Sequence, residues 1–194
     1  MHPIEHGEDG ARRIHPEDAD EWRAWLAAHH TETTGVWVAT WRKASGNVGL
    51  TYDALVRQAL CFGWIDAVTR KLDDERTLQY CAPRKRGSGW ARTNKTRIRE
   101  LEEAGLIAPA GVAVIAAAKA DGSWTLLDDV EDLVVPADLA EAFDDRPGAR
   151  DAWDGFPPSA RKQMLAHVAL AKRPATRAAR IVAVAEAAAR GERL

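Results

Sequence analysis

The chain has 194 residues, of which 46% are hydrophobic and 29% charged, and its formal net charge is −2. This balance excludes a disordered chain and a protein that is basic overall, and it allows one core with a small appended bundle. The first residues lack the apolar segment of a signal peptide, and no run reaches the roughly 18 apolar residues of a membrane span, so we expect a cytoplasmic protein that does not contact a membrane.

The first part of the chain alternates helices with strands. The predicted elements are, in chain order, a mobile arm (1–14), a helix (15–30), a strand (35–43), a helix (51–63) and two strands (64–72 and 77–85). Trp22, Trp25 and Leu26 share one face of the first helix, and Thr51 and Gly63 are suited to cap the second. The last two strands are joined by a short acidic turn, so they should pair antiparallel.

The second part of the chain is predicted to be helical. Its elements are a helix that starts at Trp90 (90–105), an almost uncharged helix (109–122), a linker with an apolar patch (123–136) and three helices that begin with proline (136–145, 157–172 and 174–191). Ser88 is expected to cap the first of these helices and Gly105 to end it. The uncharged helix should be covered on most sides.

These elements predict an α+β protein in which a small antiparallel sheet is covered by helices and a helical subdomain follows. We place a domain boundary near Asp128. The predicted organisation is a mobile N-terminal arm (1–14), an α+β domain with a candidate pocket (15–127) and a C-terminal helical subdomain (128–194).

The sequence offers little for a metal, a cofactor or a nucleophile. The six histidines lack the spacing of ligands on one rigid element, and no phosphate-binding loop or nucleophile elbow occurs. The two cysteines, Cys61 and Cys81, lie in apolar segments and are expected to be buried thiols. We therefore expect no metal site and no cofactor.

A local basic run is the main candidate for chemistry. The segment "YCAPRKRGSGWARTNKTRIRE" (80–100) carries seven Lys or Arg before its first acid. Gly87 and Gly89 precede a predicted helix start, where backbone N–H groups favour an anion. Arg84, Arg86, Arg92 and Lys95 could converge there, while Trp64 and Trp90 offer flat walls and Asp66 a hydrogen-bond acceptor. The alternative interpretation is an exposed, solvated helix face anchored by its tryptophan.

Two groups of motifs resemble the YdeI/OmpD-associated, or bacteriocin-protection, family. The first comprises "CFGWIDA" from Cys61 and "PRKRGSGWARTNKTRI" from Pro83, and the second is "AKRPATRAARI" (171–181). The resemblance covers roughly residues 22–191. Ala67 stands where the family commonly has Gly, and Ala91 replaces a Ser after the tryptophan, which puts polar contacts of a ligand at that point in doubt.

The resemblance implies a role in tolerance of bacteriocins or stress, without an established reaction. It favours a pocket for a small anionic or aromatic ligand, with the site residues Trp64, Asp66, Arg84, Trp90, Asn94 and Lys95. The alternative is a nucleic-acid-binding protein that uses the basic stretch from Arg84 to Arg99. An enzyme with Asp66 as general base and a protein-binding role are further hypotheses. The second basic segment, Lys172 to Arg180, is expected to bind acids such as Asp144 and Asp145, or to fold over the first site.

Overall fold

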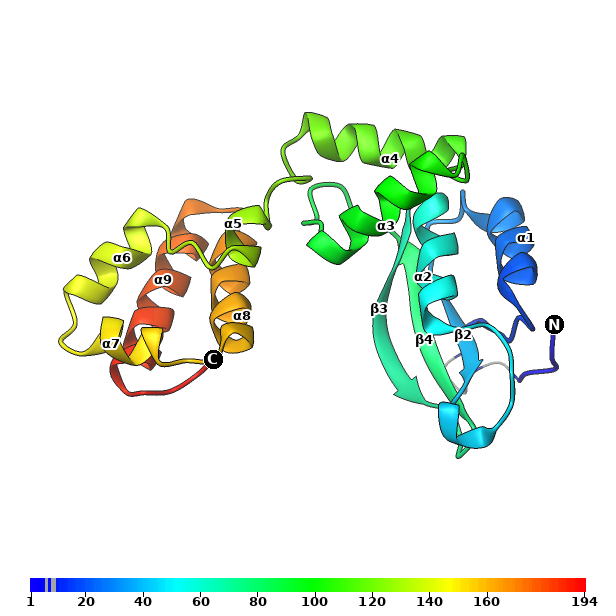
Figure 1. The fold of residues 1–194 in the computed structure, drawn as a ribbon, viewed down its shortest axis with the longest axis horizontal. Coiled ribbons are helices and arrows are strands. Elements are labelled where there is room, and N and C mark those ends of the chain that lie inside the picture. Colours follow the sequence, from blue (N-terminus) through cyan, green and yellow to red (C-terminus); the bar gives the residue numbers. More distant parts are fainter. Residues whose placement is uncertain (6, 8–9) are drawn as a thin grey trace. The chain divides into compact units, whose positions relative to one another are not determined.

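The computed structural model describes residues 1–5, 7 and 10–194 (Figure 1). The chain forms two compact units. The N-terminal unit comprises Met1–Arg86 and Thr93–Ala120, and the C-terminal unit comprises Gly87–Arg92 and Asp121–Leu194. Within the described residues, no helix is long and apolar enough to cross a membrane.

The N-terminal unit contains a four-stranded sheet of order β1-β2-β4-β3. Its strands are β1 (Arg13–Ile14), β2 (Val36–Trp41), β3 (Trp64–Lys71) and β4 (Arg76–Pro83). The predicted antiparallel pairing of β3 with β4 is confirmed, and β2 also pairs antiparallel with β4. The short β1 pairs parallel with β2, so the chain just before the first helix joins the sheet edge.

The predicted mobile arm, 1–14, includes residues 6, 8 and 9, which lie outside the described part of the chain. Its described residues contact the N-terminal unit. The backbone N–H of His2 donates to the carbonyl of His15 at 2.8 Å, and the terminal ammonium of Met1 donates to Glu21 at 2.5 Å. Ile4 and Ala11 pack against the sheet face that carries Trp37.

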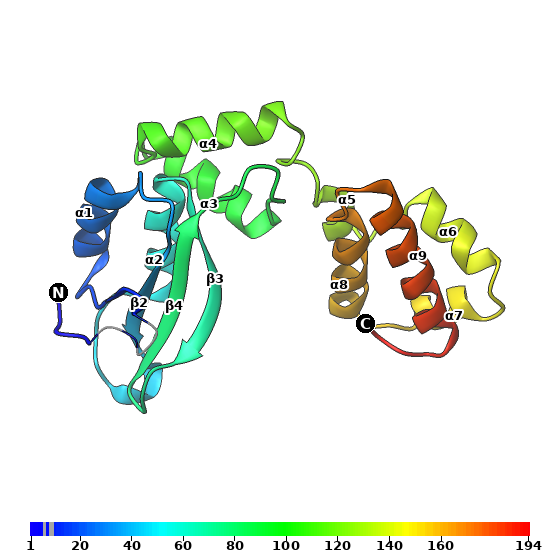
Figure 2. The same ribbon diagram turned by 180° about the vertical axis from the view of Figure 1, so that it is seen from behind.

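Helices cover the opposite face of this sheet. They are α1 (Ala19–His29), α2 (Tyr52–Cys61), α3 (Arg92–Glu103) and α4 (Pro109–Ala120), with a short 3₁₀ helix η1 (Lys43–Ser45). Figures 1 and 2 show α2 lying along one face of β3 and β4. Asp18 and Thr51 cap α1 and α2 through their side-chain oxygens, as the sequence indicated for Thr51. The buried Trp22 donates its indole N–H to the carbonyl of Leu55 at 3.0 Å and so ties α1 to α2.

The expectation that the uncharged helix is covered on most sides is wrong. In α4 only Gly111, Ile115 and Ala118 are buried, and Val112 is 54% exposed. Alanine accounts for the difference, because it favours a helix without requiring burial. A low charge content therefore indicated helix formation here but not the degree of burial.

A bulge in β3 changes the predicted alternation. Asp66 pairs with Cys81 but Thr69 pairs with Gln79, so three steps on β3 oppose two on β4. The extra residue turns Thr69 to the same side as Asp66, and both side chains reach Gln79. Strict alternation along residues 64–72 would place Thr69 on the opposite face from Asp66, but that expectation is wrong here because alternation requires an unbroken ladder.

The C-terminal unit contains five helices in the described residues. They are α5 (Asp128–Glu131), α6 (Ala137–Asp144), α7 (Ala149–Asp154), α8 (Pro158–Ala169) and α9 (Pro174–Ala189). Apolar residues at helical spacing in α6, α8 and α9 form its core, with Trp153 of α7. The segment predicted as a linker also packs there through Leu127, Val130 and Leu133, so the point near Asp128 lies inside this unit. An α+β fold with a helical C-terminal part is thus confirmed.

Candidate functional site

The six predicted site residues belong to two different units. Trp64, Asp66, Arg84, Asn94 and Lys95 lie in the N-terminal unit, whereas Trp90 lies in the C-terminal unit.

The two tryptophans of the predicted site are core residues. Trp64 is 1% exposed, its indole N–H donates to the carbonyl of His30 at 3.1 Å, and its ring packs edge-on against Trp25. Trp90 is also 1% exposed and lies 5.0 Å, centroid to centroid, from Trp124. Neither ring is arranged as an open wall for a ligand, because each is already covered by protein.

Asp66 is the centre of a polar network on the helix-covered face of the sheet. Its Oδ2 accepts hydrogen bonds from the Tyr52 hydroxyl at 2.7 Å and from the Gln79 amide at 3.3 Å. The hydroxyl of Thr69 donates to Gln79 at 2.5 Å, which fixes the orientation of that amide. Burial and the bond to Asp66 raise the pKa of Tyr52 to about 12, so the phenol stays a donor.

The predicted polar residues Arg84, Asn94 and Lys95 are half-buried in the N-terminal unit. Burial lowers the pKa of Arg84 to about 10, and the charge of Asp66 acts in the opposite direction. Asn94 accepts a hydrogen bond from Arg97 at 3.0 Å, and Arg97 also pairs with Asp53. The sequence analysis did not single out Arg97 and Tyr52, which carry these contacts.

Neither cysteine has the environment of a nucleophile. Cys61 and Cys81 are both buried and free, as expected. Burial raises the pKa of each thiol, and for Cys81 the nearby charge of Asp66 adds to the effect. Among the described residues, no group of three or more His, Cys, Asp or Glu side chains is arranged to hold a metal ion.

Two acids of the C-terminal unit contact Arg92, one of the cations that were expected to converge on an anion. Helix α3 begins at Arg92 and not at Trp90, so Ser88 is too far upstream to be its N-cap. The backbone N–H of Arg92 donates to Glu131 at 3.4 Å, and its guanidinium pairs with Asp132 at 2.7 Å. These two carboxylates stand where the sequence analysis expected a bound anion.

The second basic segment also binds an acid, but not the one expected. Arg177 donates through Nε and Nη2 to the two oxygens of Asp138, at 2.8 and 2.9 Å. Asp138 lies in the first turn of α6, whereas the expected partners, Asp144 and Asp145, lie at the end of this helix. Arg180 instead donates to the carbonyl of His167 at 2.6 Å and so ties α9 to α8.

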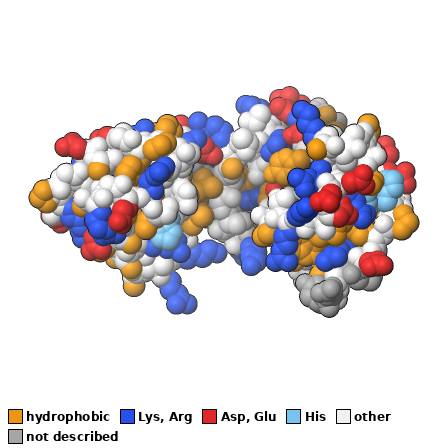
Figure 3. Space-filling view, turned by 90° about the horizontal axis from the view of Figure 1, so that it is seen from below, with side chains coloured by type: hydrophobic (Ala, Val, Ile, Leu, Met, Phe, Trp, Pro, Cys, Tyr) orange, Lys and Arg blue, Asp and Glu red, His pale blue; other side chains and the backbone are white. Residues whose placement is uncertain are grey.

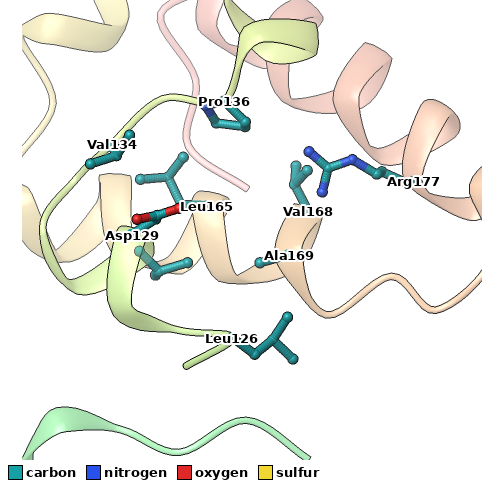
Figure 4. Close-up of a pocket in the computed structure, with 9 residues that line it drawn as sticks. Leu126, Asp129, Val134, Pro136, Leu165, Val168, Ala169 and Arg177 are labelled. Atoms are coloured by element: carbon teal, nitrogen blue, oxygen red, sulfur yellow. The ribbon is translucent and has the colours of Figure 1, made fainter. Parts of the chain in front are cut away.

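A pocket of about 200 Å³ lies inside the C-terminal unit beside Arg177 (Figure 4). Its lining is mostly apolar and comes from the residues just before α5, α5 itself, the following loop, α8 and α9: Leu126, Asp129, Val130, Val134, Pro136, Leu165, Val168, Ala169 and Arg177. Figure 4 shows Asp129 and Arg177 on different sides of the pocket, with the aliphatic side chains between them. No sequence pattern pointed to this pocket, because α5 has only four residues and its segment was predicted to be a linker.

Two family models match different parts of the chain. Residues 14–114, just over half of the sequence, match a domain of unknown function, DUF8412, and the chain belongs to that family. Residues 132–191 match the model described as Bacteriocin-protection, YdeI or OmpD-Associated, which confirms the suspected resemblance. That match includes the "AKRPATRAARI" signature, while the motifs from Cys61 and Pro83 lie within the range of the first model. No curated protein and no solved structure shows significant similarity to the chain.

Proposed function

We propose that the protein binds a small acid with an aromatic or branched aliphatic body in the pocket of the C-terminal unit, as part of a role in tolerance of bacteriocins or stress. The observation that carries this proposal is the apolar pocket with Arg177 at its side (Figure 4). A concave apolar site with a few fixed polar groups is the usual form of a small-molecule site. Most of its lining residues fall within the segment matched by the bacteriocin-protection model.

Arg177 is suited to hold the acidic group. Its planar guanidinium has five N–H donors, and Asp138 engages only Nε and Nη2. Asp138 therefore orients the group and raises the pKa of Arg177, which remains a cation at any physiological pH. Because Asp138 already fixes the Arg177 side chain, this side chain would lose little further conformational entropy when a ligand carboxylate binds.

The other features of the pocket limit the ligand's size and polarity. A volume of about 200 Å³ is below the roughly 300–1,000 Å³ of sites for drug-sized molecules. One ring or one short branched chain would fill it. Asp129 would repel a second acidic group, but it could accept a hydrogen bond from a ligand hydroxyl or amino group. We therefore expect a monoanion that carries a donor at the end opposite its acid.

The proposal is tested with a thermal-shift screen of benzoates, hydroxybenzoates and short branched hydroxy acids, followed by calorimetry of any hit. Arg177→Met should remove the ligand-dependent rise in Tm, and Val168→Phe should remove it by filling the pocket. Arg180→Met is the matched control, since Arg180 lies on the same helix and bonds to His167 outside the pocket lining. The proposal fails if no acid raises the Tm, or if a hit binds equally well to both pocket variants.

Nucleic-acid binding has less support from the geometry. Within the stretch from Arg84 to Arg99, Arg92 is paired with Asp132 and Arg97 with Asp53. Figure 3 shows Lys and Arg side chains interspersed with Asp and Glu on the face that it presents. Retention on single-stranded DNA at low salt would favour this alternative over the ligand pocket.

A further inference from the structure

The segment Gly87–Arg92, which we call the docked segment, belongs to the C-terminal unit although both of its neighbours in the chain belong to the N-terminal unit. It is short, and its sequence is Gly-Ser-Gly-Trp-Ala-Arg. Three of its contacts within the C-terminal unit each have a different physical basis.

The first point is a hydrophobic anchor. The ring of Trp90 is almost completely buried and packs against Trp124. A buried tryptophan contributes more to recognition than most residues, because it removes a large apolar area from water with few rotatable bonds.

The second point is a close backbone approach. A Cβ atom built on Gly89 would lie 2.7 Å from Cγ and 2.8 Å from Cδ1 of Leu127. With any larger residue at this position, either the Leu127 side chain or the segment would have to shift. Gly87 has a φ of +71°, which glycine adopts without strain. The surface therefore selects for glycine directly before the tryptophan.

The third point is a pair of acids that hold the end of the segment. Asp132 binds the Arg92 guanidinium at 2.7 Å, and Glu131 accepts the backbone N–H of the same residue at 3.4 Å. Asp132 is the main cause that raises the pKa of Arg92. Glu131 is itself held by Lys162 of α8 at 2.7 Å, so its position is set before the segment binds.

We propose that the surface formed by Trp124, Leu127, Glu131 and Asp132 is a peptide-recognition site, and that Gly87–Arg92 is its resident occupant. The partner it fits is a protein segment with the order Gly-Trp-x-Arg, in which the aromatic anchor precedes the cation by two residues. A buried anchor next to a charge contact is the usual arrangement in recognition of short segments. This site is separate from the ligand pocket, because the pocket lining includes none of these four residues.

The resident segment determines how the site must be probed. A tethered occupant competes at an effective concentration on the order of millimolar, so a free peptide should bind the wild-type chain poorly. The full-length double variant Trp90→Ala/Arg92→Ala removes both anchors from the resident segment and leaves the recognition surface unchanged. We expect a fluorescein-labelled peptide of sequence Gly-Ser-Gly-Trp-Ala-Arg to bind this variant at least tenfold more tightly than the wild type, as measured by anisotropy.

The controls test each anchor in the peptide. Replacing its Trp by Ala, or its Arg by Glu, should weaken binding at least tenfold. Adding Asp132→Arg to the double variant should reverse the preference, so that the Glu peptide binds better than the Arg peptide. If circular dichroism shows that the double variant does not fold, Arg92→Glu takes its place and should bind the unaltered peptide at least tenfold more tightly than the wild type. The proposal is overturned if the peptide binds the variant and the wild type with equal affinity, or if replacing the Trp or the Arg of the peptide leaves its affinity unchanged.

Discussion

The hydroxyl of Tyr52, at the start of α2, donates to Oδ2 of Asp66, on β3, at 2.7 Å. This bond joins a helix start to the sheet beside the bulge of β3. It also makes Asp66 a hydrogen-bond acceptor for a side chain of its own unit.

We expect Tyr52 to ionise only near pH 12. Burial is the larger cause of the raised pKa and the bond to Asp66 is the next one. Asp66→Asn should therefore lower the pKa of Tyr52 part of the way back toward 10. The chain has two tyrosines, and a Tyr80→Phe background leaves Tyr52 as the one observed in an absorbance titration at high pH. Ionisation near pH 10 in that background would contradict the hydrogen bond seen here.

His15 should make stability depend on pH. Its ring is 1% exposed, packs against His2 and Trp41, and has no hydrogen-bond partner on either nitrogen within the described residues. Burial, followed by the charges of His2 and Arg76, lowers its pKa from 6.5 to about 4, while the charge of Asp73 acts in the opposite direction. The folded state therefore binds fewer protons than the unfolded chain between these two values.

It follows that the contribution of neutral His15 to the free energy of unfolding is complete above pH 6.5 and is lost as the pH falls toward 4. The loss is on the order of 3 kcal/mol, from about 1.4 kcal/mol for each pKa unit. Urea titrations at several pH values should show this decline, and His15→Phe should flatten it. His167→Gln, in the other unit, serves as the control and should keep the wild-type slope.

Gly111 should tolerate no side chain. A Cβ built there would lie 2.3 Å from the carbonyl oxygen of Cys61, which is backbone at the end of α2 and cannot move aside. We expect Gly111→Ala to lower the unfolding free energy by roughly 1–3 kcal/mol despite the higher helix propensity of alanine. Gly155→Ala is the matched control, because its nearest contact is 3.4 Å, and its Tm should stay close to that of the wild type.

Trp64→Phe distinguishes a core residue from a ligand contact. The change removes the donor to the His30 carbonyl and part of the packing against Trp25, and we expect a loss of roughly 1–3 kcal/mol in urea denaturation. The affinity of the C-terminal pocket for any acid found in the screen should stay unchanged. If the Trp64→Phe variant is fully folded but binds the acid more weakly, Trp64 has a role in ligand binding and is not only a core residue.

The fold class and most elements could be predicted because their signals are local. Apolar residues at helical spacing identified the core faces of α6, α8 and α9, and Thr51 identified a helix start. The exposure of α4 could not be predicted in the same way. Whether Val112 is covered depends on what lies beside the helix, and an alanine-rich segment forms a helix in either case.

The candidate site was harder to predict, because charge and aromaticity do not reveal partners. Arg92 and Trp90 resembled a ligand site until Asp132, forty residues later, and Trp124 were placed beside them. The pocket near Arg177 gave no signal because its lining comes from three segments that are separated in the sequence.

The sequence alone determined that this is an α+β protein with a helical C-terminal part related to the bacteriocin-protection family, since periodicity, caps and motifs are properties of neighbouring residues. Tertiary structure alone decided that Trp64 and Trp90 are core residues, that a bulge brings Thr69 and Asp66 to one amide, and that Arg177 faces a pocket. These outcomes depend on contacts between residues far apart in the chain, which follow from packing and hydrogen-bond satisfaction across the folded unit.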